Sequence, residues 1–79
     1  MDNRGYSKRV IDANKKASLD SLGVRLGRLC INEDISVAEV AEVLGVSRMT
    51  IYKWFTGHFT PKKTFEGKIL AFLSDNKSK

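Results

Sequence analysis

Apolar residues recur at steps of three and four along most of the 79-residue chain, which is the period of an α-helix with one buried face. The first clear run spans residues 18–32 and has its apolar positions at Leu19, Leu22, Leu26, Leu29 and Cys30. Gly23 and Gly27 would weaken an isolated helix. Their presence in this run therefore predicts that it packs closely against a crossing helix.

Two short helices with a tight connection are predicted next. Ser36 precedes the segment VAEVAEVLG, and Glu39 stands three residues after it, which is the pattern of a capping box at the start of a helix. The apolar face of this helix comprises Val37, Val40, Ala41 and Leu44. Gly45 suits the left-handed residue that ends a helix, and Ser47 can cap the helix that follows.

The helix after Ser47 has two unlike faces. Its predicted core face comprises Ile51, Trp54 and Phe55, and the opposite stripe comprises Arg48, Met49, Tyr52, Lys53 and Thr56. Gly57 is expected to end it. Thr60 and Pro61 predict the start of a fourth helix with proline at its first position, and its inward residues are Phe65, Ile69, Phe72 and Leu73.

The two ends of the chain are more polar. Residues 1–17 form either a flexible basic arm or a short extra helix, residues 18–74 the main domain, and residues 75–79 a polar tail. No run in the sequence has the period of a β-strand. We therefore expect an all-α fold, a compact bundle of four to five helices.

The net charge of +5 is unevenly distributed. Residues 1–17 carry five basic and two acidic side chains, residues 18–44 carry two and five, and residues 45–79 carry seven and two. A basic surface on a small domain typically attracts nucleic acid phosphates, and a solubilising charge is the alternative.

Composition argues against catalytic chemistry. The chain has one cysteine and one histidine, and no acid–base pair or activated nucleophile is indicated. Cys30 lies in an apolar segment and is expected to be a reduced core residue. We predict a protein that is not an enzyme, with no catalytic residue, metal site or cofactor. No apolar run is long enough for a membrane span, so an intracellular location is expected.

A short helix, a tight turn and a second helix with a polar outward stripe fit the major groove of DNA, which admits one α-helix. The first helix braces the second, which requires a small residue at the crossing and a glycine at the turn. Ala41 and Gly45 occupy those positions. Glu39 and Glu42 must then point away from the phosphates.

The run ISVAEVAEVLGVSRMTIYKWFTGHFTP resembles the helix-turn-helix of the phage repressor and Cro class, the lambda-repressor-like or XRE-type domains. The resemblance covers about residues 22–73 and rests on Ala41, Gly45, Val46, Ser47, Ile51, Trp54, Gly57 and Pro61. Val37 departs from the class, because many members have a glutamine there that supports the recognition helix.

The resemblance implies a sequence-specific protein that binds double-stranded DNA. It further implies a small transcriptional regulator in the cytoplasm of a bacterium, encoded by the bacterium or by a phage, that pairs as a homodimer formed on DNA. Two alternatives stay open. One is a DNA-bending recombination or architectural factor, and the other is an interaction module for a protein of the transcription machinery.

The resemblance also implies roles for individual residues. The base contacts are Arg48, Met49 and Lys53. The backbone contacts are Ser47, Thr50, Tyr52, Thr56, His58, Lys62 and Lys63. From the residues alone, the alternative is that Arg48 and Lys53 touch only phosphates, that Met49 packs against a neighbour, and that Ser47 serves as a helix cap.

Overall fold

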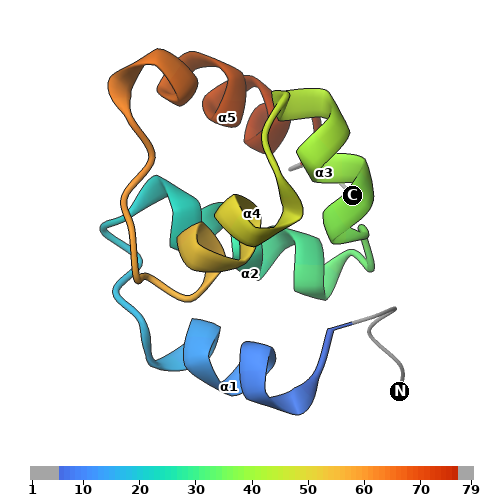
Figure 1. The fold of residues 1–79 in the computed structure, drawn as a ribbon, viewed down its shortest axis with the longest axis vertical. Helices are drawn as coiled ribbons and strands as arrows, with labels where there is room; N and C mark the ends of the chain where they lie inside the picture. The colour runs from blue at the N-terminus through green and yellow to red at the C-terminus, as the bar shows by residue number, and fades with distance from the viewer. Residues whose placement is uncertain (1–5, 77–79) are drawn as a thin grey trace.

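Five α-helices make up the computed structural model, which describes residues 6–76 (Figure 1). They are α1 (Lys8–Lys16), α2 (Leu22–Asn32), α3 (Val37–Leu44), α4 (Arg48–Phe55) and α5 (Lys63–Asn76). The described range contains no strand, so the prediction of an all-α fold is confirmed. Helices α2 and α4 cross at the centre, and α1 and α5 lie on opposite sides of them (Figure 1).

The core is formed largely by the apolar faces that the sequence pattern predicts, but Val24 and Ile31, which lie outside the predicted face of α2, are buried too. Its completely buried side chains include Leu26, Cys30, Leu44, Ile51, Phe55 and Ile69. Burial in this apolar setting raises the pKa of the Cys30 thiol to about 12, with a smaller effect from Glu39. The thiol is therefore protonated and shielded, as expected for a core cysteine.

The start of α2 differs from the sequence-based expectation. The helix begins at Leu22, and residues 18–21 form a turn in which the Ser18 hydroxyl accepts a hydrogen bond from the Asp20 N–H at 3.1 Å. This local bond competes with helix formation. Leu19, expected on the buried face, is consequently 47% exposed.

The two glycines of α2 mark its crossing with α4, as predicted. A Cβ atom at Gly23 would lie 2.8 Å from the Cβ of Trp54, and one at Gly27 would lie 2.7 Å from the Phe55 ring. Both distances are shorter than side chains tolerate. The glycines therefore let the two helices approach closely enough to form one core.

Helix α5 differs from the prediction at both ends. Pro61 is not its first residue but is buried in the connection, and the first helical residue is Lys63. The Phe65 N–H donates to the Lys62 carbonyl at 2.9 Å, which closes the first turn after the proline. The helix continues to Asn76, so residues 75 and 76, placed in the polar tail, are helical.

Within residues 1–17, residues 8–16 form helix α1, and residues 1–5 lie outside the described range. Asn14 is completely buried, and its Nδ2 donates to the carbonyls of Val24 at 3.1 Å and Phe55 at 2.7 Å. Arg28 completes the network, donating from Nε to Asn14 Oδ1 at 2.9 Å. These bonds join α1 to both central helices.

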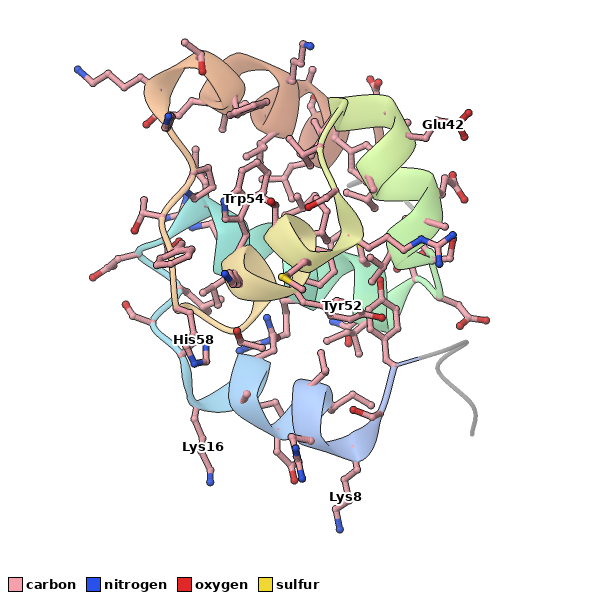
Figure 2. The ribbon with its side chains drawn as sticks, in the orientation of Figure 1. Lys8, Lys16, Glu42, Tyr52, Trp54 and His58 are labelled. Carbon is pink, nitrogen blue, oxygen red and sulfur yellow. The ribbon has the colours of Figure 1, made fainter. Side chains whose placement is uncertain are left out.

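A second anchor lies at the N-terminal end of α1. The Tyr6 ring is buried, and its centroid lies 6.1 Å from that of the Phe55 ring. Its hydroxyl donates to the carbonyl of Ile35, which lies between α2 and α3. Burial is the main cause that raises the pKa of this phenol. The opposite face of α1 is solvent-exposed, and Lys8 and Lys16 project from it away from the body of the molecule (Figure 2).

Candidate nucleic-acid interface

The connection between α3 and α4 has the predicted caps and turn. Ser36 Oγ accepts from the Glu39 N–H at 3.1 Å at the start of α3, and Ser47 Oγ accepts from the Thr50 N–H at 3.2 Å at the start of α4. Gly45 has φ +73°, the left-handed conformation that glycine adopts without steric cost. Its N–H bonds the Ala41 carbonyl at 2.8 Å, so α3 ends there and the chain turns into α4.

The inward face of α4 is fixed to the core. Ile51 and Phe55 are completely buried, and Trp54 is 4% exposed. Ala41 of α3 is buried too, at the predicted crossing. Val37 also points into the core, so an apolar contact stands where repressor-class proteins often have a glutamine.

The outward stripe of α4 is only partly covered by protein. Arg48 is exposed and Met49 is 67% exposed, whereas Tyr52, Lys53 and Thr56 are half-buried. Helix α4 lies on the near side of the molecule in Figure 2, and Glu42 projects from α3 away from it. The Glu42 carboxylate is therefore separated from the outward stripe of α4, as expected from the sequence.

The N-terminal end of α4 is electropositive. Arg48 lies in its first turn, which contains no acidic residue, whereas the first turn of α3 contains Glu39. A cation at this end opposes the helix dipole and so does not stabilise the helix. The hydroxyls of Ser47 and Thr50 lie 3.0 Å apart and share one hydrogen bond, which leaves one hydroxyl proton for an outside acceptor.

At the C-terminal end of α4, the side chains form a local network. The Thr56 hydroxyl donates to the Tyr52 carbonyl at 2.9 Å, so its oxygen accepts from His58 Nδ1 at 2.8 Å. Lys53 Nζ lies 4.8 Å from the centroid of the Phe59 ring, within the range of a cation–π contact.

Lys62 and Lys63 lie where the chain enters α5, and both are exposed. The structure brings Lys62 together with Thr50 along one groove, which Trp54 and Thr60 also line. From the sequence, Trp54 was expected in the core alone, and Thr60 was expected only at the start of the fourth helix. Helical period identifies the outward stripe of α4 but gives no information about this groove.

The C-terminal end of α1 lies near the end of α4. The exposed cations of α1 are Lys8, Arg9, Lys15 and Lys16. Gly57, with φ +81°, ends α4 so close to α1 that a Cβ there would lie 3.0 Å from the Cβ of Ala17. This contact places the end of α1, though not its lysine side chains, beside the loop that follows α4.

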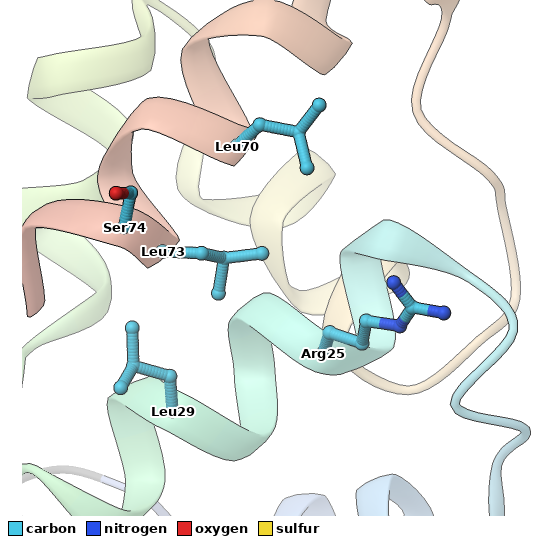
Figure 3. Close-up of a pocket in the computed structure, with 5 residues that line it drawn as sticks. All are labelled: Arg25, Leu29, Leu70, Leu73 and Ser74. Carbon is cyan, nitrogen blue, oxygen red and sulfur yellow. The ribbon is translucent and has the colours of Figure 1, made fainter. Parts of the chain in front are cut away.

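A second groove, of about 490 Å³, lies between α2 and α5 and is mainly apolar (Figure 3). It is lined by Arg25, Leu29, Leu70, Leu73 and Ser74. None of these residues belongs to α4. Among residues 6–76, no three His, Cys, Asp or Glu side chains are grouped in a way that could hold a metal ion.

No described helix combines the length and the apolar character that crossing a membrane requires.

One comparison with known proteins gives a match. Residues 25–58 match the family model of a homeodomain-like domain. No curated protein and no solved structure matches the chain. The matched segment begins in α2 and continues through the tight turn and α4 to His58. The chain therefore contains a helix-turn-helix similar to that of homeodomain-like domains, with α3 and α4 as its two helices.

Proposed function

We propose that this protein binds double-stranded DNA sequence-specifically and inserts α4 into the major groove. The observation that carries the proposal is the contrast between the two faces of α4. Ile51 and Phe55 fix the inward face to the core, while Arg48 and Met49 project into solvent from the outward face. A rigid helix with a free polar stripe is what direct readout of base edges requires.

Base readout is assigned to Arg48, Met49 and Lys53. Arg48 suits bidentate hydrogen bonds to guanine O6 and N7, and Met49 suits contact with a thymine methyl group. Lys53 lies over the Phe59 ring and must move from it, or carry the ring along, to reach a base. Its contact is therefore expected to be weaker than that of Arg48.

Backbone contacts are assigned to the ends of α4 and the loop beyond it. At the N-terminal end of α4 they come from Ser47 and Thr50. Along the remainder of α4, the loop after it and the start of α5, they come from Tyr52, Thr56, His58, Lys62 and Lys63. Thr56 acts through His58, because its own hydroxyl proton is directed to the Tyr52 carbonyl. A phosphate contact from His58 would come from Nε2, because Nδ1 is bonded to the Thr56 hydroxyl.

At the cellular level, we propose a small transcriptional regulator of the phage repressor and Cro type. It acts in the cytoplasm of a bacterium, encoded by the cell or by a phage, and pairs as a homodimer on DNA. The support is the sequence pattern around Gly45 and the caps at Ser36 and Ser47. It has no catalytic role in this proposal.

One observation favours a second candidate, a protein-interaction module. Met49 is 67% exposed and Phe59 is 57% exposed, and both lie on or beside α4. Exposed apolar side chains on one face are typical of protein contacts, such as a contact with the transcription machinery. Binding to such a partner would depend little on salt, whereas binding to DNA weakens steeply as salt rises.

Selection of bound duplexes from a random pool, at a stated salt concentration, tests the proposed function. We expect enrichment of a short motif containing a guanine, and affinity that falls linearly on a plot of log affinity against log salt. Recovery of unenriched sequences would leave only nonspecific attraction. Failure to retain any duplex at low salt would overturn DNA binding altogether.

A further inference from the structure

A groove of about 430 Å³ separates α4 from the segment that leads into α5. Trp54 and Phe65 provide aromatic lining, and their ring centroids lie 5.3 Å apart. Thr50, Thr60 and Lys62 provide polar lining. The groove therefore combines two hydroxyls and one ammonium group with an apolar surface, immediately beside the proposed recognition helix.

Trp54 contributes a hydrogen-bond donor that the fold leaves unused. The residue is 96% buried, yet within residues 6–76 no hydrogen bond satisfies its indole N–H. In the same range, Ser21 Oγ is the side-chain polar atom that is both fully buried and unpaired, so the indole nitrogen retains access to solvent. Trp54 lines the groove, so its side chain adjoins any ligand bound there.

The donor is also held rigidly. Gly23 lies so close that a Cβ there would come within 2.8 Å of the Trp54 Cβ, and Phe65 packs against the ring. The contact at Cβ fixes the point from which the side chain extends, and burial together with the Phe65 ring restricts rotation of the indole. A donor fixed in this way loses little conformational entropy when it binds a ligand.

The charge around the groove favours an anion. Lys62 immediately precedes α5, whose N-terminal end carries the positive pole of the helix dipole. Arg48 and Thr50 lie in the first turn of α4, where the same effect applies. Among common biological ligands, a phosphate group accepts hydrogen bonds from N–H, hydroxyl and ammonium donors together.

We propose that this groove binds one phosphodiester of the DNA backbone, with the Trp54 indole N–H as a direct donor to a phosphate oxygen. The proposal rests on the proposed function, because the ligand is the duplex that α4 reads. Thr50, Thr60 and Lys62 complete the contact, and the aromatic rings pack against the sugar. The phosphate position then fixes the depth and rotation of α4 in the major groove.

The indole N–H can be observed directly, because the chain contains one tryptophan. Nuclear magnetic resonance of the ¹⁵N-labelled full chain gives one indole cross-peak for titration with a short random-sequence duplex at low salt. We expect the proton resonance to move downfield and its exchange with water to slow on binding. A parallel titration with inorganic phosphate at matched ionic strength should leave the peak nearly unchanged.

The outcomes separate this inference from the proposed function. If the amide peaks of α4 shift with duplex while the indole peak stays in place, the phosphate contact is wrong and DNA binding stands. If inorganic phosphate alone reproduces the indole shift, the groove is a general anion site and the backbone proposal is overturned. If no peak responds to any duplex, both proposals fail.

A substitution provides an independent test. Trp54→Phe removes the donor but keeps an aromatic ring, and we expect about tenfold weaker binding to all duplexes, with an unchanged salt slope because no charge is lost. Phe65→Leu trims the same groove without removing a donor and should weaken binding much less. Equal losses for the two variants, at melting temperatures that show both folded, would overturn the proposal.

Discussion

At the residue scale, Arg48 lies at a position where its positive charge does not stabilise α4. It is exposed in the first turn of α4, where a positive charge opposes the helix dipole. We predict that Arg48→Ala lowers the affinity for the selected duplex by about 1–3 kcal/mol and removes the preference at one base position. The free energy of unfolding should stay unchanged or rise by about 0.3 kcal/mol.

Lys62→Ala is the matched control for this prediction. It should weaken selected and random duplexes alike and reduce the slope of log affinity against log salt by about one. Fluorescence anisotropy with labelled duplexes at several salt concentrations measures both effects. If Arg48→Ala also weakens every duplex equally, its role is electrostatic and base readout by Arg48 is wrong.

Gly45 gives a prediction about stability. Its φ of +73° is a conformation that costs a residue with a side chain about 1–2 kcal/mol, and a β-branched residue more. Gly45→Val should therefore lower the free energy of unfolding by at least that amount, even though no neighbouring atom lies within 4 Å of an added Cβ. The cause is backbone strain alone, which denaturant unfolding followed by circular dichroism can measure.

Gly67 provides the opposite result in the same assay. It lies within α5, has open space around an added Cβ and has no positive φ. Gly67→Ala should stabilise the protein by roughly 0.5–1 kcal/mol through helix propensity. Similar effects of the two substitutions would contradict the assignment of Gly45 to a left-handed turn.

The site was partly predictable at this scale. Helical period alone separates Ile51 and Trp54 from Met49 and Lys53, because residues three and four apart share a face. The bond from Thr56 to His58 and the free N–H of Trp54 depend on where side chains lie after packing. Sequence spacing does not contain that information.

At the element scale, α1 depends on one buried polar residue. Asn14 donates to carbonyls of α2 and α4 and accepts from Arg28, so its removal leaves several buried polar groups unpaired. We predict that Asn14→Ala lowers the free energy of unfolding by about 2–3 kcal/mol. Amide hydrogen exchange should accelerate most in α1 and at the end of α4.

Asp12→Ala is the control on the same helix. Asp12 is exposed, and its loss should change stability by less than about 0.5 kcal/mol. If Asn14→Ala is equally mild, water replaces the amide without cost and α1 is held by Tyr6 instead. Faster amide exchange in the first turn of α1, measured in Tyr6→Phe, would then identify Tyr6 as the anchor.

The elements differ in how far sequence determines them. Helices α3 and α4 were predicted with their ends, because Ser36, Gly45 and Ser47 act through local hydrogen bonds and backbone preference. Helix α1 has a weak apolar pattern and is fixed by Tyr6 and Asn14, whose partners lie far away in the chain. Its folding is a tertiary effect that periodicity does not reveal.

At the scale of the whole molecule, charge and shape agree with a binding surface around α4. Basic side chains lie on α4, at the start of α5 and on α1, while Glu42 of α3 points away from α4 (Figure 2). The net charge of +5 is thus concentrated on some faces and partly cancelled on others. Such an arrangement orients the protein on DNA before any base is read.

The size of the molecule leads to the last prediction, which concerns pairing on DNA. One recognition helix covers only a few base pairs, and helix-turn-helix proteins commonly read two half-sites about 34 Å apart. The molecule extends 32 × 26 × 22 Å along its principal axes, so two copies fit side by side on one face of the duplex at that spacing. We expect selection to give a two-fold symmetric motif that binds two copies.

Sedimentation with and without the selected duplex measures this stoichiometry. The free protein should sediment as a monomer at low concentration, and a duplex with both half-sites should bind two copies with positive cooperativity. A duplex with one half-site should bind one copy, more weakly, because the contact between neighbours is lost. A one-to-one complex on the full site at saturating protein would show that a single α4, with the surfaces of α1 and α5 beside it, accounts for all of the recognition.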